Sequence, residues 1–267
     1  MLPQPTDGFT WVQAPSGPAL VCRALQPMAD HVFTTRPWAL GSSVVATDAD
    51  WQPVAAALDV DLAHLVRAHQ VHNASVVVCR EGDGGFDATR ARTTGADIIV
   101  SNDASLALAI QAADCVPLLI ADARTGAVAA AHAGWRGLAA RVPSVAVEAL
   151  TREFGSRPED LVAVIGPSIS AERYEVGGDV RDRFQAAGCA AALIDRWFRP
   201  GDRRGHWFFD GWRSARDQLE AAHLRPGNIH VAALCTASHP EALCSCRRDG
   251  TGAGRVAGAI RKLRVKS

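Results

Sequence analysis

The chain has 267 residues, of which 48% are hydrophobic and 21% are charged, as in ordinary folded globular proteins. Its 28 basic residues balance its 28 acidic ones, which argues against a general nucleic-acid-binding protein. No apolar run reaches the ~18 residues of a membrane span, and the N-terminal sequence MLPQPTDGFTW lacks the basic and apolar regions of a signal peptide. The seven cysteines show no paired spacing, so we expect reduced thiols in a cytoplasmic protein.

In chain order, short apolar runs predict strands, and helical periodicity predicts helices. The predicted strands are 19–25, 31–35, 75–79, 97–100, 106–110, 116–120, 127–131, 161–165 and 229–234. The predicted helices are 51–58, 135–154, 179–187 and 212–222. Polar stretches at 81–87 and 199–205 are predicted to be surface loops. Strands dominate the middle and helices the second half, which predicts one α/β domain with a mixed sheet over residues 1–267.

The segment ADCVPLLIADARTGAVAAAHAGWRG, residues 113–137, holds the densest set of reactive side chains. We predict a hairpin with strands 116–121 and 126–132 and a turn through residues 122–125. If Asp122 pairs with Thr125, Cys115 lies directly opposite His132, with Cβ atoms about 4.5–5.5 Å apart. That spacing suits two ligands of one tetrahedral zinc, or a Cys–His nucleophile pair. A slip of one residue in the register would place the two on opposite faces.

Two histidines in AHQVHNASV, His69 and His72, are alternative third ligands. One cysteine and two histidines would leave one zinc position open, as in catalytic rather than structural sites. Asp114, next to Cys115, is a candidate proton shuttle or a support for a ligand. Its alternative role is to cap local backbone.

Two further features favour anion binding. Gly134, Trp135, Arg136 and Gly137 follow His132 and open a predicted long helix, whose first N–H groups and dipole attract anions. Arg247 and Arg248 lie in the Gly-rich stretch CSCRRDGTGAGR, where adjacent guanidiniums can clamp phosphate or carboxylate. The alternative for this stretch is a flexible basic surface loop.

Several segments together resemble the YfiH family, also labelled laccase-domain proteins or multicopper polyphenol oxidases. The matching segments are HVFTTR (31–36), QVHN (70–73), ADCVPLLI (113–120), HAGWRG (132–137), IGPSIS with YEVGGDV (165–180), CT (235–236) and SCRRDGTGAGR (245–255). The resemblance implies a single-domain, mixed-sheet α/β sandwich of the YfiH type, related to cysteine hydrolases. It also implies zinc bound by His72, Cys115 and His132.

The activity that the resemblance implies is phosphorolysis of purine nucleosides. Adenosine, inosine and 5'-methylthioadenosine would give free base and a ribose 1-phosphate, with adenosine deamination beside it. Arg36, Arg136, Arg247 and Arg248 are the expected phosphate clamp, and Cys115, His132 and Asp114 the catalytic residues. The expected partners are nucleosides and phosphate, with no nucleic acid and no membrane.

The sequence departs from the family pattern at two places. The stretch PWALGSSVVATDADW after Arg36 is shortened, and Leu243, Cys244 and Cys246 replace the usual aromatic residues before RRDG. Because both stretches are expected to line the pocket, the substrate preference is the part of the resemblance that carries over least.

Three other functions compete with the phosphorylase. The first is a metal-free hydrolase with Cys115 as nucleophile and His132 as base, including an editing role on a peptidoglycan precursor. The second is a copper polyphenol oxidase. None of the nine histidines forms the His-x-His pair that multicopper oxidases use, so copper would be adventitious, drawn by its high intrinsic affinity. The third is a non-enzymatic zinc protein, against which three protein ligands argue.

Overall fold

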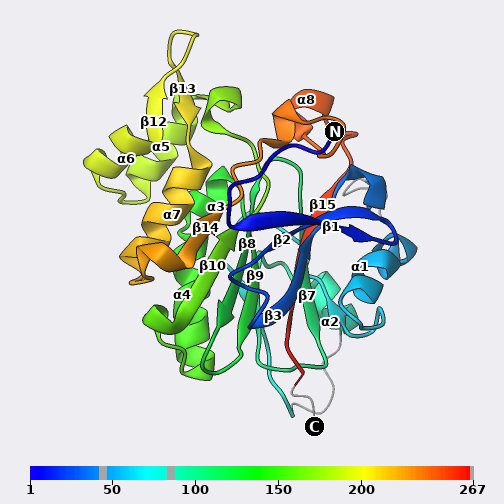
Figure 1. Cartoon of the computed structure of the whole chain (residues 1–267). Coiled ribbons are helices and arrows are strands. Elements are labelled where there is room, and N and C mark those ends of the chain that lie inside the picture. The colour runs from blue at the N-terminus through cyan, green and yellow to red at the C-terminus, as the bar shows by residue number, and fades with distance from the viewer. Residues whose placement is uncertain (42–46, 83–87, 265–267) are drawn as a thin grey trace.

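The computed structural model describes residues 1–41, 47–82 and 88–264 (Figure 1). In this part of the chain, no helix has the length and apolarity that a membrane crossing requires. The described residues form two six-stranded sheets and one three-stranded sheet. Most strand pairs are antiparallel, whereas β4 pairs with β7, β5 with β6 and β10 with β14 in parallel. The mixed α/β class predicted from the sequence is confirmed.

The strands are ordered as follows within each sheet. The first sheet is β1 (Phe9–Ala14), β2 (Gly17–Cys22), β3 (Ala29–Phe33), β15 (Val256–Lys262), β7 (Ala107–Ala112) and β4 (Leu65–Val66). The second sheet is β14 (Ile229–Val231), β10 (Leu161–Ile165), β8 (Val116–Asp122), β9 (Val128–Ala133), β6 (Ile98–Ser101) and β5 (Val76–Cys79). The small sheet is β11 (Glu175–Gly177), β13 (His206–Phe209) and β12 (Phe198–Pro200).

Helices flank the large sheets, while α5 and α6 lie beside the small sheet and α8 lies at one end of the molecule (Figure 1). The α-helices are α1 (Gln52–Ala57), α2 (Ala88–Thr93), α3 (Trp135–Ala139), α4 (Val142–Phe154), α5 (Gly178–Ala186), α6 (Ala191–Trp197), α7 (Gly211–Ala221) and α8 (Cys246–Asp249). Short 3₁₀ helices span Arg36–Trp38, Asp48–Trp51, Pro158–Asp160, Ala171–Arg173, Pro226–Asn228 and Thr236–Ser238. Helices α4 and α7 cover the second sheet, and α1 packs with Trp38 and Trp51 on the first.

Three apolar cores hold these layers together. The central core lies between the two large sheets and includes Phe33 and Leu108 from the first and Ile99 and Leu119 from the second. Successive residues of a strand point to opposite faces. For this reason Leu118, next to Leu119, packs instead with the helices on the outer side. Continuous apolar runs such as LVAVI are therefore buried on both faces, as a layered α/β protein requires.

The hairpin β8–β9 forms, but its register differs from the predicted one. Pro117, not Cys115, lies opposite His132. The carboxylate of Asp122 accepts hydrogen bonds from the backbone N–H groups of Arg124 and Thr125 and from the Thr125 hydroxyl. Asp122 pairs with Ala127 and not with Thr125, so four residues, 123–126, lie between the paired positions instead of two. A shift of two residues keeps the face of every side chain, so Cys115 and His132 still share one face.

The predicted helix 135–154 is wrong as a single element, because it breaks between α3 and α4. Arg141 adopts the left-handed conformation with φ 62°, and Pro143 then occupies the first turn of α4. A proline is accommodated in a first turn but not in a helix interior, so the chain restarts rather than continues. The predicted loop 199–205 begins inside β12, and residues 83–87 of the predicted loop 81–87 lie outside the described residues.

Candidate active site

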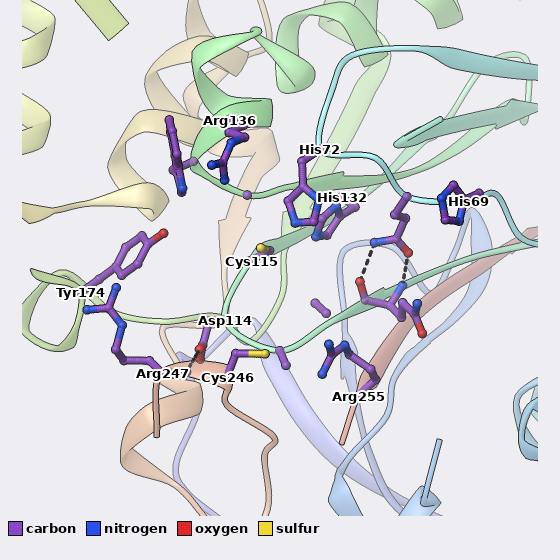
Figure 2. A pocket seen from close by; sticks show the side chains of 16 residues that line it. His69, His72, Asp114, Cys115, His132, Arg136, Tyr174, Cys246, Arg247 and Arg255 are labelled. Carbon is purple, nitrogen blue, oxygen red and sulfur yellow. Dashed lines mark hydrogen bonds between the residues drawn. The ribbon is translucent and has the colours of Figure 1, made fainter. Parts of the chain in front are cut away.

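A cavity of about 550 Å³ opens where the loops after β4, β7 and β9 meet α8 (Figure 2). Its walls combine residues from segments far apart in the sequence. The lining residues are His69, Gln70, His72, Gln111, Ala112, Ala113, Asp114, Cys115, His132, Gly134, Trp135, Arg136, Tyr174, Cys246, Arg247 and Arg255. Most of the residues singled out from the sequence are therefore brought to one place.

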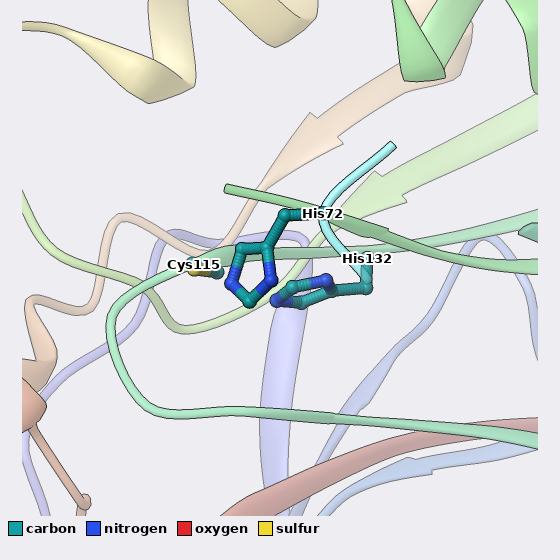
Figure 3. A group of neighbouring side chains, drawn as sticks. All are labelled: His72, Cys115 and His132. Carbon is teal, nitrogen blue, oxygen red and sulfur yellow. The ribbon is translucent and has the colours of Figure 1, made fainter. Parts of the chain in front are cut away.

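Three of these side chains converge (Figure 3). The ligand atoms of His72, Cys115 and His132 all lie within 4.8 Å of one another. The imidazole rings of His72 and His132 stand edge to face, with centroids 4.9 Å apart. His69 borders the pocket but is not part of this group. The His72–Cys115–His132 group could hold a metal ion.

Gly134 provides the space in which the group assembles. A Cβ atom at this position would lie 2.8 Å from the Cys115 sulfur and 3.1 Å from Cδ2 of His72. The φ angle of Gly134 is −69°, so the need for glycine is one of room and not of conformation. A larger residue would push the thiol and the imidazole away from each other.

The electrostatics of the group favour a charged thiolate. Burial raises the pKa of the Cys115 thiol, but His132 and His72 lower it more, from 9.0 to about 6. Burial lowers the pKa of His132, but the Cys115 thiolate and Asp97 raise it to about 9. In the metal-free protein at neutral pH, Cys115 and His132 therefore form a thiolate–imidazolium pair. The thiolate is the form that binds metals and attacks electrophiles.

Asp97 is a candidate site residue that the strand pattern marks only as the start of a strand. Its side chain is fully buried, and Oδ1 lies 2.8 Å from Nδ1 of His132. Oδ2 accepts hydrogen bonds from the backbone N–H groups of Val71 and Asn73, on either side of His72. One carboxylate thus positions both histidines. No spacing rule could have found it, because Asp97 is 35 residues from His132.

Replacing Asp97 with asparagine is expected to weaken metal binding. The amide offers one acceptor oxygen in place of two, so it cannot satisfy His132 and the backbone around His72 together. Loss of such a partner typically costs about 10–100-fold in metal affinity. Competition with a chelator for Zn²⁺ measures the effect. Asp103→Asn, at a half-buried position in the loop after β6, is the matched control. An unchanged affinity in a folded Asp97→Asn protein would contradict the role.

Asp114 connects the loop that carries Cys115, between β7 and β8, to α8. It adopts φ 91°, and its carboxylate accepts hydrogen bonds of 2.6 Å from the Thr236 hydroxyl and from the Arg247 backbone N–H. The alternative role expected for Asp114 is to cap local backbone. The backbone group bound here is instead 133 residues away.

The four arginines expected to bind phosphate separate into two pairs. Arg136 stacks over the Trp135 ring at 4.1 Å and Arg247 over the Tyr174 ring at 4.9 Å, and both line the pocket. Neither forms an ion pair with a carboxylate in the described part of the chain. Their charge is therefore available to an anion. The helix α3 that carries Arg136 has only five residues, so the expected contribution of a long helix dipole is wrong.

Arg36 and Arg248 lie outside the pocket lining. Both guanidiniums contact the carboxylate of Asp249, at 2.7 Å for Arg36 and 2.6 Å for Arg248. Arg248 also donates to the carbonyl oxygens of Thr236 and Leu243. Arg248 holds α8 against the segment before it, and Arg36 connects α8 to the 3₁₀ helix Arg36–Trp38. Cys246, Arg255 and Tyr174 line the pocket instead, and all three fall within segments that the family resemblance includes.

Comparison with known proteins places this pocket in a family. Residues 40–262 match the family described as multi-copper polyphenol oxidoreductase laccase. The chain belongs to this family. The crystal structure of YfiH from Bacillus licheniformis matches with a TM-score of 0.85 and 27% identity, and covers 96% of this chain and 100% of that one. The resemblance and the fold inferred from the sequence are thereby confirmed.

Relatives in this laccase-labelled family carry the names of nucleoside enzymes. A purine nucleoside phosphorylase of Deinococcus radiodurans is 34% identical over 257 residues, or 91% of this chain and 92% of that protein. One of Bacteroides thetaiotaomicron is 37% identical over 62% of this chain and 60% of its own length. Adenosine deaminase RL5, from an unknown prokaryotic organism, is 33% identical over 74% of this chain and 75% of its own.

Proposed function

We propose that the chain is a zinc-dependent purine nucleoside phosphorylase. It acts on adenosine, inosine and 5'-methylthioadenosine to give free base and ribose 1-phosphate, with accompanying adenosine deamination. The observation that carries this proposal is the His72–Cys115–His132 group beside two guanidiniums, in one pocket, that form no ion pair with a carboxylate of the described residues. The names of the relatives support it.

The donor set fits zinc. One thiolate and two imidazoles are typical zinc ligands, and three protein ligands leave one position for water or substrate. The buried Asp97 carboxylate on His132 is the kind of partner that orients a ligating imidazole. When bound, zinc would supply a Lewis acid that lowers the pKa of water toward 7, which deamination requires.

The protein's own residues supply the remaining chemistry. Arg136 and Arg247 hold phosphate by charge-assisted hydrogen bonds and fix it against the ribose, because positioning is the main requirement of this step. Arg36 and Arg248 stabilise α8, the helix that carries Arg247, through their ion pairs with Asp249. Asp114 is the carboxylate among the lining residues, so we assign it the proton exchange with the purine.

A second candidate function is favoured by the contacts of Asp97. Cys115, His132 and Asp97 form a nucleophile, a base and a carboxylate that orients the base, which is the arrangement of cysteine hydrolases. This function, with the editing of a peptidoglycan precursor as one form of it, requires no metal. Polyphenol oxidation has less support. The described residues contain one group of metal-capable side chains, whereas a multicopper oxidase needs a cluster of several coppers.

Product analysis with adenosine tests the proposal. The purified protein is incubated with adenosine, with and without inorganic phosphate, and the products are separated by chromatography. We expect adenine and ribose 1-phosphate only when phosphate is present, and inosine in both conditions. Inosine and 5'-methylthioadenosine are tested in the same way. If a folded, zinc-loaded sample releases base from none of the three nucleosides, the phosphorylase assignment is wrong.

A further inference from the structure

The pocket has two chemically different sides, one on each side of the His72–Cys115–His132 group (Figure 2). Arg136, Tyr174 and Arg247 lie on one side, and His69 and Arg255 on the other. The first side carries two guanidiniums without carboxylate partners among the described residues. Two of the three arginines that line the pocket therefore lie on the side of Tyr174.

Contacts within the protein hold the backbone and the ring of Tyr174 in place. Its backbone N–H donates to the Ala171 carbonyl at 3.1 Å, and its carbonyl accepts from the Phe209 N–H at 3.0 Å. Its ring packs against Phe209, with centroids 6.0 Å apart, and the Arg247 guanidinium lies over it. Within the described ranges the hydroxyl has no hydrogen-bond partner, and its oxygen points into the pocket (Figure 2).

Tyr174 lines two adjoining cavities of the site. Tyr174 lines the main cavity together with Arg136 and Arg247. It also borders a small recess that it shares with Cys115 and Gly134. A half-buried polar group that is held rigidly and has no protein partner is available to a ligand.

The hydroxyl is a donor in this setting. Burial and the negative charge of Cys115 raise the pKa of Tyr174 above its ordinary value, so the phenol stays protonated over the physiological range. A neutral phenol between two guanidiniums complements an anion with several oxygens, since each oxygen accepts from a different donor. Phosphate has this chemistry, and a neutral nucleoside does not.

We propose that Tyr174 is a substrate-contacting residue whose hydroxyl donates a hydrogen bond to the phosphate held by Arg136 and Arg247. This proposal rests on the proposed phosphorylase function. It adds a residue that neither the spacing of the sequence motifs nor the charge of the pocket identifies, and it assigns phosphate to one side of the pocket. The nucleoside then occupies the side of His69 and Arg255.

Tyr174→Phe tests the contact, because it removes the hydroxyl and keeps the ring that packs on Phe209 and beneath Arg247. We expect the KM for phosphate to rise about ten- to a hundredfold, the usual effect of losing a hydrogen bond to a charged group. The KM for adenosine and the phosphate-independent deamination should change less than about twofold. Trp207→Phe is the matched aromatic control, because Trp207 lies in β13 of the small sheet, which begins one residue after Tyr174, and outside the pocket lining.

Binding of inorganic phosphate to the zinc-loaded protein, measured by calorimetry without nucleoside, gives a readout independent of turnover. A weaker affinity in Tyr174→Phe than in Trp207→Phe supports the contact even if the wild-type protein releases no base, in which case only the phosphorylase function fails. Equal phosphate affinity and equal KM for phosphate in the two variants would overturn the contact. So would a uniform loss that affects deamination as much as phosphorolysis.

Discussion

Removal of the metal from the purified protein is expected to abolish base release and deamination, and added zinc is expected to restore both. If the three converging side chains bind zinc, one coordination position would stay open for substrate, and the ion would act directly in the reaction. Loss of a Lewis acid that stabilises the transition state by several kcal/mol lowers the rate by more than about a hundredfold. Dialysis against a chelator, elemental analysis and activity before and after addition of zinc measure this.

The control for this experiment is the Cys115→Ala variant. It should contain less than a tenth of the zinc of the wild-type protein, by an order-of-magnitude expectation for loss of one of three ligands. Added zinc should not restore its activity. Full activity in wild-type protein that is verified to be metal-free would refute the metal enzyme and favour the cysteine hydrolase.

Alkylation of Cys115 is expected to separate the two candidate functions most sharply. A zinc-bound thiolate reacts slowly with iodoacetamide, because its lone pairs are engaged by the metal. In the metal-free protein the pKa of about 6 makes Cys115 roughly 90% thiolate at pH 7, so labelling should accelerate by at least about tenfold. The rate should then fall as the pH drops through about 6, because the thiolate becomes protonated. Peptide mapping by mass spectrometry follows the label.

Cys246 is the internal reference in the same sample. It lines the same pocket, but burial raises the pKa of its thiol, so its labelling should stay slow before and after chelation. Fast labelling of Cys115 in the untreated protein, with activity that survives removal of zinc, would mean that the thiolate is a free nucleophile. The hydrolase would then be the function of this site.

The sequence could predict that Cys115 and His132 lie on the same face of the hairpin. The face on which a strand residue lies depends only on whether its position is odd or even. The hairpin register was wrong by two residues, since the Asp122 side chain closes a longer turn. Side chains alternate along a strand, so an even error leaves Cys115 and His132 on the same face. A one-residue error would have removed the site from the prediction. The pairing of Cys115 with His132 follows from the strand pattern, and the family resemblance chooses His72 over His69. The spacing across the hairpin depends on turn contacts that the sequence does not reveal.

Other parts of the site depend on contacts between distant segments. Asp97 contacts the side chain of His132 and the backbone N–H of Val71, and only the folded chain places these groups beside it. The break after α3 depends on the left-handed conformation of Arg141, which periodicity does not register. The different partners of Arg247 and Arg248 depend on which one of two adjacent residues faces Asp249. Local patterns predict elements, but these tertiary contacts decide which charges remain available to substrate.

The position of β15 in the first sheet has a consequence for the order in which the parts of the pocket form during synthesis. This strand pairs with β3 on one side and β7 on the other, so the middle of the first sheet consists of residues 256–262. During synthesis, β3 and β7 leave the ribosome long before the strand that joins them, and α8, with its pocket residue Arg247, emerges just ahead of that strand. The hairpin that carries Cys115 and His132 can form early, from local contacts. The wall opposite it is completed last, so a nascent chain can present the thiolate before it presents a closed binding pocket.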